Sequence, residues 1–548
     1  MSVPVSTAAA QHARPQDFTS SATPARVNAQ QLRAMLADGR ELALIDVREE
    51  LVFSQDHLLL ARSVPLSRFE LKFAALVPRC ATRIVLCDNA DGLAERAAAI
   101  LARNSYSDVS VLDGGVANWT AAGFELFSGV NVPSKAFGEF VEHACRTPSI
   151  AAEELERLLR TGADLVVLDS RPFDEYMRVS IPTAVNVPGA ELVLRARELA
   201  PSPRTTVVVN CAGRTRSIIG AQSLINAGLP NKVLALRNGT MGWSLAGFAC
   251  DNGQNRRAPG VSADTLQWAR QAAKHVAQNC GVETIDHAVF DRLSADQGRT
   301  TYLFDVRDPA EYEAGHVPGA ISAPGGQLVQ ATDQYVGTLR ARIVLVDDAE
   351  VRALMTASWL RQMGWQDLFV LAEAGTEIGR PATPSLDAAI DSDSAIDLAS
   401  FGELFACHAA SVVDLSLSRD YLKEHIPGAW FAIRTRLARA LKQIPLRKTL
   451  VLTSDDGVLA AMAVAEAAGL VNVPVRFLAG GNAACRGAGY ELSTEPLLAD
   501  EAVDQWRKPY ERSGDAKTAM SEYLAWEIDL LGRVERDGLL KFTCVGSE

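Results

Sequence analysis

One stretch decides the fold of this 548-residue chain: Val207-Val208-Val209-Asn210-Cys211-Ala212-Gly213-Arg214-Thr215-Arg216-Ser217-Ile218-Ile219-Gly220. A run of β-branched apolar residues ends at Asn210, and an apolar-periodic segment that predicts a helix begins after a short loop, at Ser217. Cys211 is therefore expected at the carboxyl end of a buried strand, in a loop that leads into a helix N-terminus.

The residues around Cys211 favour a reactive thiol over a structural one. Backbone N–H groups in such a loop favour negative charge, and so favour the thiolate, the nucleophilic form of cysteine. Arg214 and Arg216 add positive charge for an anionic substrate. The alternative is a buried structural cysteine, because free cysteine is among the most buried residue types. Gly213 and the two arginines are poor core residues, which favours the reactive reading.

Length and charge restrict the classes of protein that remain. A chain of 548 residues is too long for one core, so three to five domains are expected. The net charge of −12 argues against nucleic acid or an anionic membrane as the main partner. No apolar run approaches the ~20 residues that span a bilayer. Residues 1–26 lack the features of a signal peptide and are expected to form a disordered arm.

The cysteines are scattered along the chain. They number nine and include no C-x-x-C pair: Cys80, Cys87, Cys145, Cys211, Cys250, Cys280, Cys407, Cys485 and Cys544. This pattern predicts neither a disulfide framework nor a zinc site. A reducing cytoplasm is the expected location.

The same pattern occurs four times along the chain. Each unit has an apolar strand that ends in aspartate, a second apolar strand followed by a loop and a helix, and a third strand followed by a glycine turn. The aspartate lies two residues before the end of each of the segments that contain these strands, which are Ala43–Arg48, Val166–Arg171, Leu303–Arg307 and Val412–Ser416. Alternating strands and helices predict an α/β fold with parallel sheets, whose strand-end loops hold the functional sites.

The breaks between units predict the domain boundaries. We expect an N-terminal arm (1–26), four repeated domains (27–130, 147–250, 263–378 and 396–493) and a helical C-terminal tail (494–548). A bridging helix is expected near Thr265–Ala277, and the apolar spacing of Ala519–Val534 predicts a tail helix that packs on a neighbouring domain.

Taken together, these motifs resemble those of rhodanese domains over about residues 27–493. The resemblance rests on the Asp-x-Arg strand ends, the segment EYEAGHVPGA at Glu311–Ala320, the strand-Cys-loop-helix and the Gly-x-x-x-Trp turns. It implies four domains, each with a central parallel sheet flanked by helices. It also implies that sulfane sulfur is transferred through a cysteine persulfide.

The catalytic cysteine of the family corresponds to Cys211 alone. The aligned residues in the first, third and fourth units are Asp88, Asp347 and Ser454, which predicts that these units are inactive. Cys87 lies one residue before the loop position, so its side chain is expected in the core. The Asp-x-Arg pairs also recur in units without the nucleophile, which favours a structural role for them.

The predicted function is sulfur transfer from thiosulfate, or a similar anionic donor, to a thiophilic acceptor such as cyanide, a thiol or a protein. Cys211 is the predicted nucleophile, and the predicted substrate-binding residues are Ala212, Gly213, Arg214, Thr215, Arg216 and Ser217. The reaction needs no metal or organic cofactor, because the intermediate is a covalent persulfide. No nucleic-acid or membrane partner is expected.

Three alternatives remain open from the sequence. The donor could be mercaptopyruvate. The chain could be a multidomain binding or persulfide-sensing protein with little turnover, since three units lack the nucleophile. Phosphatase or arsenate reductase chemistry is less favoured, because four residues separate Cys211 from Arg216 whereas phosphatase-type loops have five.

Overall fold

The computed structural model describes residues 24–372, 384–388, 390–512 and 514–545. The chain forms two compact units. One comprises Ala25–Leu386 together with Trp506–Glu548, and the other is built on Asp387–Gln505. The predicted arm falls almost entirely on residues 1–23, which lie outside the described residues, as do residues 373–378 at the end of the third predicted domain.

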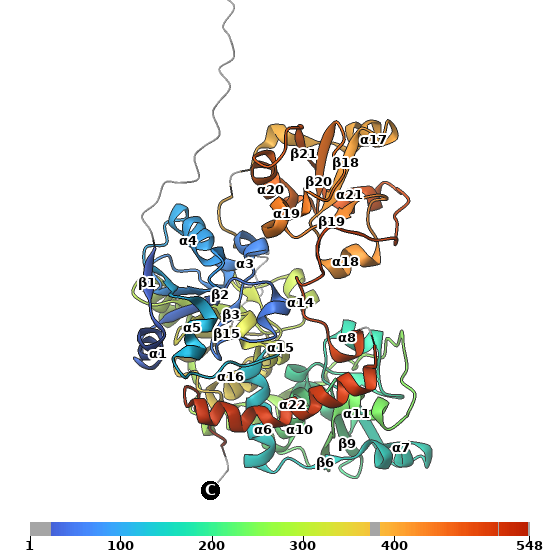
Figure 1. Cartoon of the computed structure of the whole chain (residues 1–548). Helices are drawn as coiled ribbons and strands as arrows, with labels where there is room; N and C mark the ends of the chain where they lie inside the picture. Colours follow the sequence, from blue (N-terminus) through green and yellow to red (C-terminus); the bar gives the residue numbers. More distant parts are fainter. Residues whose placement is uncertain (1–23, 373–383, 389, 513, 546–548) are drawn as a thin grey trace, which may run out of the picture. The chain divides into compact units, whose positions relative to one another are not determined.

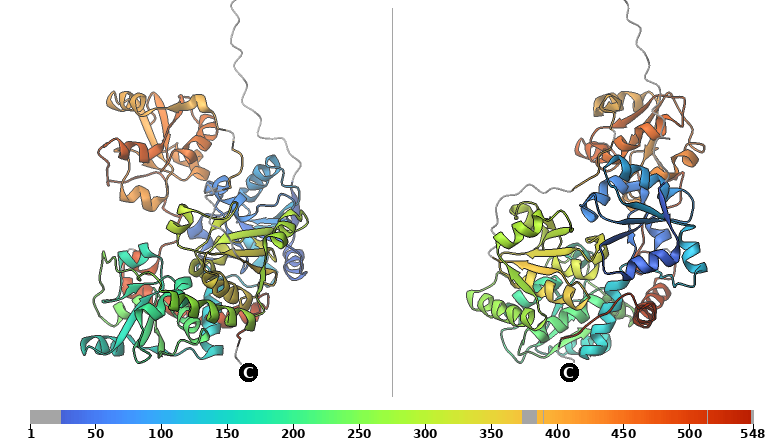
Figure 2. Two further views of the ribbon diagram at one scale, coloured as in Figure 1. Left: turned by 180° about the vertical axis from the view of Figure 1, so that it is seen from behind. Right: turned by 90° about the vertical axis from the view of Figure 1, so that its left-hand side faces the viewer.

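The first domain is a six-stranded sheet in the order β1-β5-β4-β2-β14, with β3 paired to β2. Its own elements are β1 (Ala25–Val27), α1 (Ala29–Ala37), β2 (Leu42–Asp46), α2 (Glu50–Phe53), β3 (Arg62–Ser63), η1 (Leu66–Arg68), α3 (Phe69–Leu76), β4 (Ile84–Cys87), α4 (Leu93–Arg103), β5 (Val109–Leu112) and α5 (Gly115–Ala121). All its pairs are parallel except the last: β14 (Thr338–Leu339) runs antiparallel to β2. Since β14 comes from the third domain, the two domains share a sheet edge, and Figure 2 shows them side by side.

The second domain is a five-stranded parallel sheet in the order β6-β10-β9-β7-β8. Its elements are β6 (Ser149–Ile150), α7 (Ala152–Arg160), β7 (Leu165–Asp169), α8 (Phe173–Arg178), β8 (Val185–Asn186), η2 (Gly189–Glu191), α9 (Leu192–Leu199), β9 (Thr206–Asn210), α10 (Thr215–Asn226), β10 (Val233–Leu236) and α11 (Gly239–Leu245). The central strand β9 is the Val-rich run of the sequence, and its apolar side chains are fully buried.

The third and fourth domains repeat this strand order. The third has β11 (Glu283–Ile285), α13 (His287–Ala295), β12 (Thr301–Asp305), α14 (Pro309–Ala314), β13 (Ile321–Ser322), α15 (Gly325–Gln330), η3 (Thr332–Gln334), β15 (Arg342–Val346), α16 (Val351–Gln362) and β16 (Leu368–Leu371). The fourth has η4 (Ser392–Ser394), β17 (Ala395–Ile396), α17 (Leu398–Ala406), β18 (Ala410–Asp414), α18 (Ser418–Lys423), β19 (Trp430–Phe431), η5 (Arg434–Arg436), α19 (Leu437–Ala440), β20 (Thr449–Thr453), α20 (Val458–Ala468), β21 (Val475–Leu478), α21 (Gly481–Gly487) and β22 (Leu497–Leu498). The predicted α/β class with repeated parallel sheets is confirmed.

The C-terminal tail divides between the two units. The strand β22 adds to the sheet of the fourth domain, so this domain extends beyond residue 493, where the repeat pattern ends. Residues from Trp506 onwards belong to the other unit and contain η6 (Pro509–Glu511) and the predicted tail helix, α22 (Ala516–Asp537). Figure 1 shows α22 (red) beside α6 (Val132–Cys145), the helix that joins the first two domains.

Two further features belong to the segments that join the domains. The expected bridging helix is α12 (Ala263–Asn279), which packs on α9 and α16 and thereby joins the second and third domains. Cys145, at the end of α6, forms a disulfide with Cys544 in the tail. The scattered cysteines gave no sign of this bond, because its partners are 399 residues apart in sequence.

Among the residues described, no helix has the length and apolar character that crossing a membrane requires.

Candidate active site

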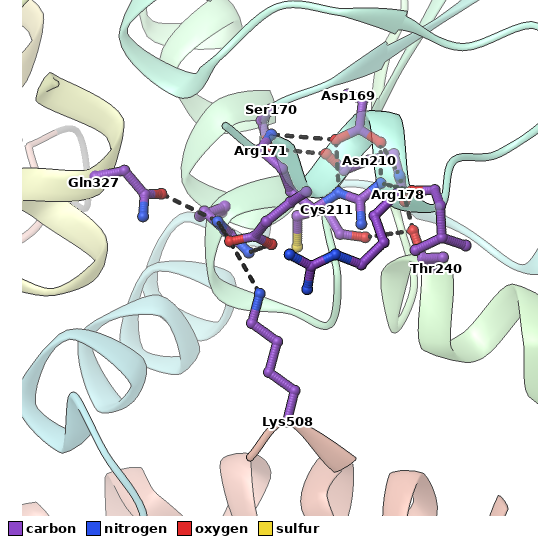
Figure 3. Close-up of polar contacts among 12 residues, drawn as sticks. Asp169, Ser170, Arg171, Arg178, Asn210, Cys211, Thr240, Gln327 and Lys508 are labelled. Carbon is purple, nitrogen blue, oxygen red and sulfur yellow. Dashed lines mark hydrogen bonds and ion pairs between the residues drawn. The ribbon is translucent and has the colours of Figure 1, made fainter. Parts of the chain in front are cut away.

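Cys211 follows the last residue of β9, and α10 begins four residues later at Thr215. The cysteine is only 1 % exposed. Its thiol donates to Ser217 Oγ at 3.4 Å, and that hydroxyl in turn donates to the Arg214 carbonyl at 2.9 Å. The structure therefore brings Cys211 and Ser217 into contact. Figure 3 shows Cys211 among the polar side chains that surround it.

The loop is held from behind by the start of α11. The N–H of Thr240 donates to the Cys211 carbonyl at 2.8 Å, and the N–H of Met241 donates to the Ala212 carbonyl at 3.0 Å. The N–H of a peptide group points opposite to its C=O. Since these two carbonyls face α11, the N–H groups of the same peptide units, which belong to Ala212 and Gly213, point away from it. Only glycine fits at position 239, where φ is +55° and a Cβ would lie 2.3 Å from the Cys211 carbonyl oxygen.

Arg214 is directed away from the loop mouth, towards α6. Its guanidinium makes a two-pronged contact with Glu139, at 2.6 and 2.7 Å, and also contacts Glu142 and, at 3.1 Å, Asn238. Glu139 is fully buried, and burial raises its pKa although Arg214 opposes the shift. The structure thus places Arg214 as a support that fixes the loop to α6.

A first prediction follows from this buried pair. Arg214→Met is expected to lower the free energy of unfolding by about 3–5 kcal/mol, because it leaves the Glu139 carboxylate buried without its partner. The deficit should shrink as the pH falls, because protonation of Glu139, whose pKa is already raised by burial, removes the unpaired charge. Urea unfolding at several pH values measures both effects.

The matched control is the exposed pair Arg157–Glu154, whose two side chains are about half exposed. Arg157→Met should cost far less than Arg214→Met, because exposed pairs contribute little. Equal costs for the two substitutions would show that the Arg214–Glu139 pair does not secure the loop.

Arg216 has a different environment. Its guanidinium contacts Glu175 of α8 at 3.0 and 3.2 Å and Gln327 of the third domain at 3.0 Å. Burial lowers the pKa of Arg216, but the charges of Glu175 and Cys211 outweigh burial and raise it. Arg216 thus points towards α8 and the third domain, whereas Arg214 points towards α6.

A buried network lies beneath the loop. Arg171 binds Asp169 at 2.7 and 2.8 Å, and Asn210 Nδ2 donates to the same carboxylate at 2.9 Å and to Thr240 Oγ1 at 3.2 Å (Figure 3). The Asp–Arg pair recurs in the first and third domains, as Asp46–Arg48 and Asp305–Arg307. Its presence in domains without the loop cysteine supports the structural role expected from the sequence.

Comparison with known proteins shows the family to which the chain belongs. A family model described as a rhodanese-like domain matches residues 28–122, 151–246 and 288–377. The chain belongs to this family. A crystal structure of a thiosulfate sulfurtransferase from Pseudomonas aeruginosa is 49 % identical in sequence, with a TM-score of 0.91, and covers 95 % of this chain and 100 % of its own.

Two curated relatives share shorter segments with this rhodanese. The HTH-type transcriptional regulator Rv0324 of Mycobacterium tuberculosis is 33 % identical over 102 residues, which is 19 % of this chain and 43 % of the regulator. The putative sulfur carrier protein YrkF of Bacillus subtilis is 28 % identical over 103 residues, which is 19 % of this chain and 54 % of YrkF. The matches thus span about half the length of these relatives.

In the other rhodanese-like domains, the residue at the cysteine position bonds to its own loop or helix. Asp88 accepts from the N–H groups of Ala90 and Ala94 at 2.8 and 3.0 Å. Asp347 accepts from the N–H of Arg352 at 3.0 Å, and Ser454 accepts from that of Ala460 at 3.3 Å. The N–H groups that favour an anion are therefore already used by an internal acceptor. That these domains are inactive stays a prediction.

Cys87 is fully buried, as the strand period predicted. Burial and the charge of Asp46 raise the pKa of its thiol well above the ordinary value, which disfavours the thiolate. Among the residues described, no cluster of His, Cys, Asp and Glu is arranged to hold a metal ion.

The tail supplies side chains to the rhodanese site that the sequence did not reveal. Glu527 of α22 is 2 % exposed and lies 3.2 Å from Lys135 Nζ and 3.4 Å from Thr215 Oγ1. Lys508, just before η6, lies 3.2 Å from Glu175. The apolar spacing of the tail predicted a helix packed on a neighbour, but no local signal identifies that neighbour, because the contacts are more than 300 residues apart.

Proposed function

We propose that this rhodanese is a sulfurtransferase that moves sulfane sulfur from thiosulfate to a thiophilic acceptor through a persulfide on Cys211. One observation supports this most strongly. Of four equivalent loop positions, only that of the second domain holds a thiol. The carbonyls of that loop accept hydrogen bonds from the start of α11, and Arg216 lies five residues after the cysteine, in the first turn of α10. The likeness to the Pseudomonas aeruginosa enzyme extends over 95 % of the chain and supports the same donor.

The reaction proceeds by double displacement. The Cys211 thiolate attacks the outer sulfur of thiosulfate. The S–S bond of the donor breaks, its electron pair leaves with sulfite, and Cys211 becomes a persulfide anion. An acceptor nucleophile, cyanide or a thiolate, then attacks the terminal sulfur. Thiocyanate or a new persulfide leaves, and the Cys211 thiolate is restored without any metal or organic cofactor.

The loop residues have distinct roles in this proposal. The backbone N–H groups of Ala212, Gly213 and Thr215 stabilise the negative sulfur of the persulfide. Ser217 Oγ, 3.4 Å from Sγ, holds the resting thiol through a hydrogen bond. Arg216 binds the sulfonate end of the donor. Arg214 acts indirectly by fixing the loop to α6, because its guanidinium is occupied by Glu139 and Glu142.

A burst experiment tests this function. When the protein is mixed with excess thiosulfate and no acceptor, about one equivalent of sulfite per chain should be released and release should then stop, because each Cys211 can accept one sulfur. Addition of cyanide should restart release and produce thiocyanate. The same experiment with mercaptopyruvate, read as pyruvate, identifies the preferred donor. Absence of a burst with every donor, together with stable capture of a protein partner, would favour the binding or persulfide-sensing alternative.

A cytoplasmic location and a protein sulfur acceptor belong to the same proposal. A nucleophilic thiol must stay reduced to act, and seven cysteines are free in the described part of the chain, Cys211 among them, whereas the Cys145–Cys544 disulfide is the feature that argues against a reducing compartment. A protein acceptor would have to reach the sulfur of a residue that is buried, so it would offer its thiol on a narrow or extended segment.

A further inference from the structure

The C-terminal tail forms part of the wall around Cys211. Residues from Trp506 onwards belong to the same compact unit as the second domain, and α22 packs on α6 and α11, the two helices that hold the catalytic loop. A Cβ on Gly213 would lie 3.1 Å from Glu527 Oε2 and 3.7 Å from Leu524, so the tail directly touches the loop. Figure 3 shows Lys508 extending from the tail towards the loop, with Gln327 on another side.

Lys508 shares a carboxylate with Arg216. Its Nζ lies 3.2 Å from Glu175 Oε1, and Arg216 Nη1 lies 3.2 Å from the same oxygen. Burial raises the pKa of Glu175, but the charges of Arg216 and Lys508 outweigh burial and hold the pKa well below its usual range. Two cations therefore share one ionised carboxylate at the start of α10, the helix that follows the Cys211 loop, and the three groups together carry a net positive charge.

The segment that carries Lys508 is fixed in place. Glu511, at the end of η6, accepts from Arg178 of α8 at 2.8 Å, so both Glu175 and Arg178 of this short helix are bound by the tail. Further along, Lys135 of α6 lies 4.7 Å from the ring centroid of Tyr523 and 3.2 Å from Glu527. These contacts fix the tail against α6 and α8, and the Lys508 side chain extends from it to Glu175.

The second cation of the site is thus different from the one the sequence suggested. From the sequence, both Arg214 and Arg216 were expected to add positive charge for an anionic substrate, but Arg214 is bound by Glu139 and Glu142 on α6. Lys508, which lies 292 residues after Arg216 in the sequence, contacts Glu175, the same carboxylate that Arg216 contacts. We propose that Lys508 is a donor-binding residue that, together with Arg216, selects dianionic donors over monoanionic ones. This proposal rests on the sulfurtransferase function proposed above.

The test compares two donors that deliver the same kind of sulfur. Thiosulfate is a dianion, and methanethiosulfonate is a monoanion. Lys508→Met should raise KM for thiosulfate by about 5–10-fold and leave kcat within about twofold, because the lost charge acts on binding of the donor. KM for methanethiosulfonate should change by less than about twofold. Lys508→Arg should restore most of the preference for thiosulfate.

Two controls separate the possible outcomes. Lys517→Met removes an exposed lysine from the same tail and should leave both KM values unchanged. If Lys508→Met alters both donors equally, or alters kcat alone, Lys508 supports the tail structurally and the proposal is wrong. If the wild-type protein turns over neither donor, the proposed function itself fails, which is distinguishable from a wild-type enzyme whose donor preference is insensitive to Lys508.

Discussion

Cys211→Ser is expected to lower steady-state turnover of thiosulfate by at least about 10³-fold. A serine hydroxyl is a far weaker nucleophile towards sulfane sulfur than a thiolate, and both half-reactions pass through the Cys211 sulfur. The hydroxyl is close in size to the thiol, and the loop carbonyls remain bonded to α11, so the fold should persist. Thiocyanate formation from thiosulfate and cyanide measures the loss, and thermal unfolding checks that the variant is folded.

The matched substitution is Cys87→Ser in the first domain. Cys87 also ends a central strand, but it is fully buried and its thiol pKa is raised well above the ordinary value by burial. This variant should keep its turnover per folded molecule, although it should be less stable because a hydroxyl replaces a buried thiol. A larger loss of turnover in Cys87→Ser than in Cys211→Ser would reverse the assignment of the nucleophile.

Gly239→Ala is expected to reduce turnover by at least about 10²-fold, because a new methyl group would push the catalytic loop out of place. Its Cβ would lie 2.3 Å from the Cys211 carbonyl oxygen and 2.7 Å from that of Gly213. Both oxygens belong to the backbone of the loop itself. They cannot move without displacing the Cys211 sulfur and the N–H groups around it.

Two glycines serve as controls for this change. Gly247 also has a positive φ, +86°, but nothing lies within 4 Å of its would-be Cβ, so Gly247→Ala adds backbone strain without a clash. Gly115 holds the equivalent place in the first domain, where a Cβ would lie 2.3 Å from the Asp88 carbonyl oxygen. Both variants should lose stability and keep turnover. If Gly115→Ala reduces turnover as much as Gly239→Ala, the effect is general unfolding and does not come from the loop.

The fold was predictable because its signals are local. Each sheet is built from short apolar strands that are read directly from the sequence, and their fourfold recurrence predicted repeated domains with parallel sheets, although not the order of the strands within a sheet. The glycine turns were visible too, although only the structure shows that Gly239 is required by a backbone contact with the catalytic loop. The antiparallel strand β14 was not foreseen, because it is a two-residue pairing between segments almost 300 residues apart.

The candidate site was predictable only in part. Cys211 could be selected as the candidate nucleophile from a single stretch, because a strand end, a loop and a helix start are consecutive in sequence. The role of Arg214 could not, because its direction depends on Glu139 and Glu142 of the joining helix. Lys508 and Glu527 could not be predicted for the same reason. Their contacts with Glu175 and Thr215 come from tertiary packing of the tail, and a helical pattern does not specify which surface the helix covers.

The most direct test of the account is to locate the transferred sulfur. The protein is incubated with thiosulfate, its free thiols and persulfides are alkylated, and its peptides are analysed by mass spectrometry. The account predicts one added sulfur per chain, on the peptide that contains Cys211. The other free cysteines, including the exposed Cys80 and Cys407, should remain unmodified. A persulfide on one of these residues in place of Cys211, or an equal gain of sulfur by Cys211→Ser, would contradict the claim that the second domain alone performs the chemistry.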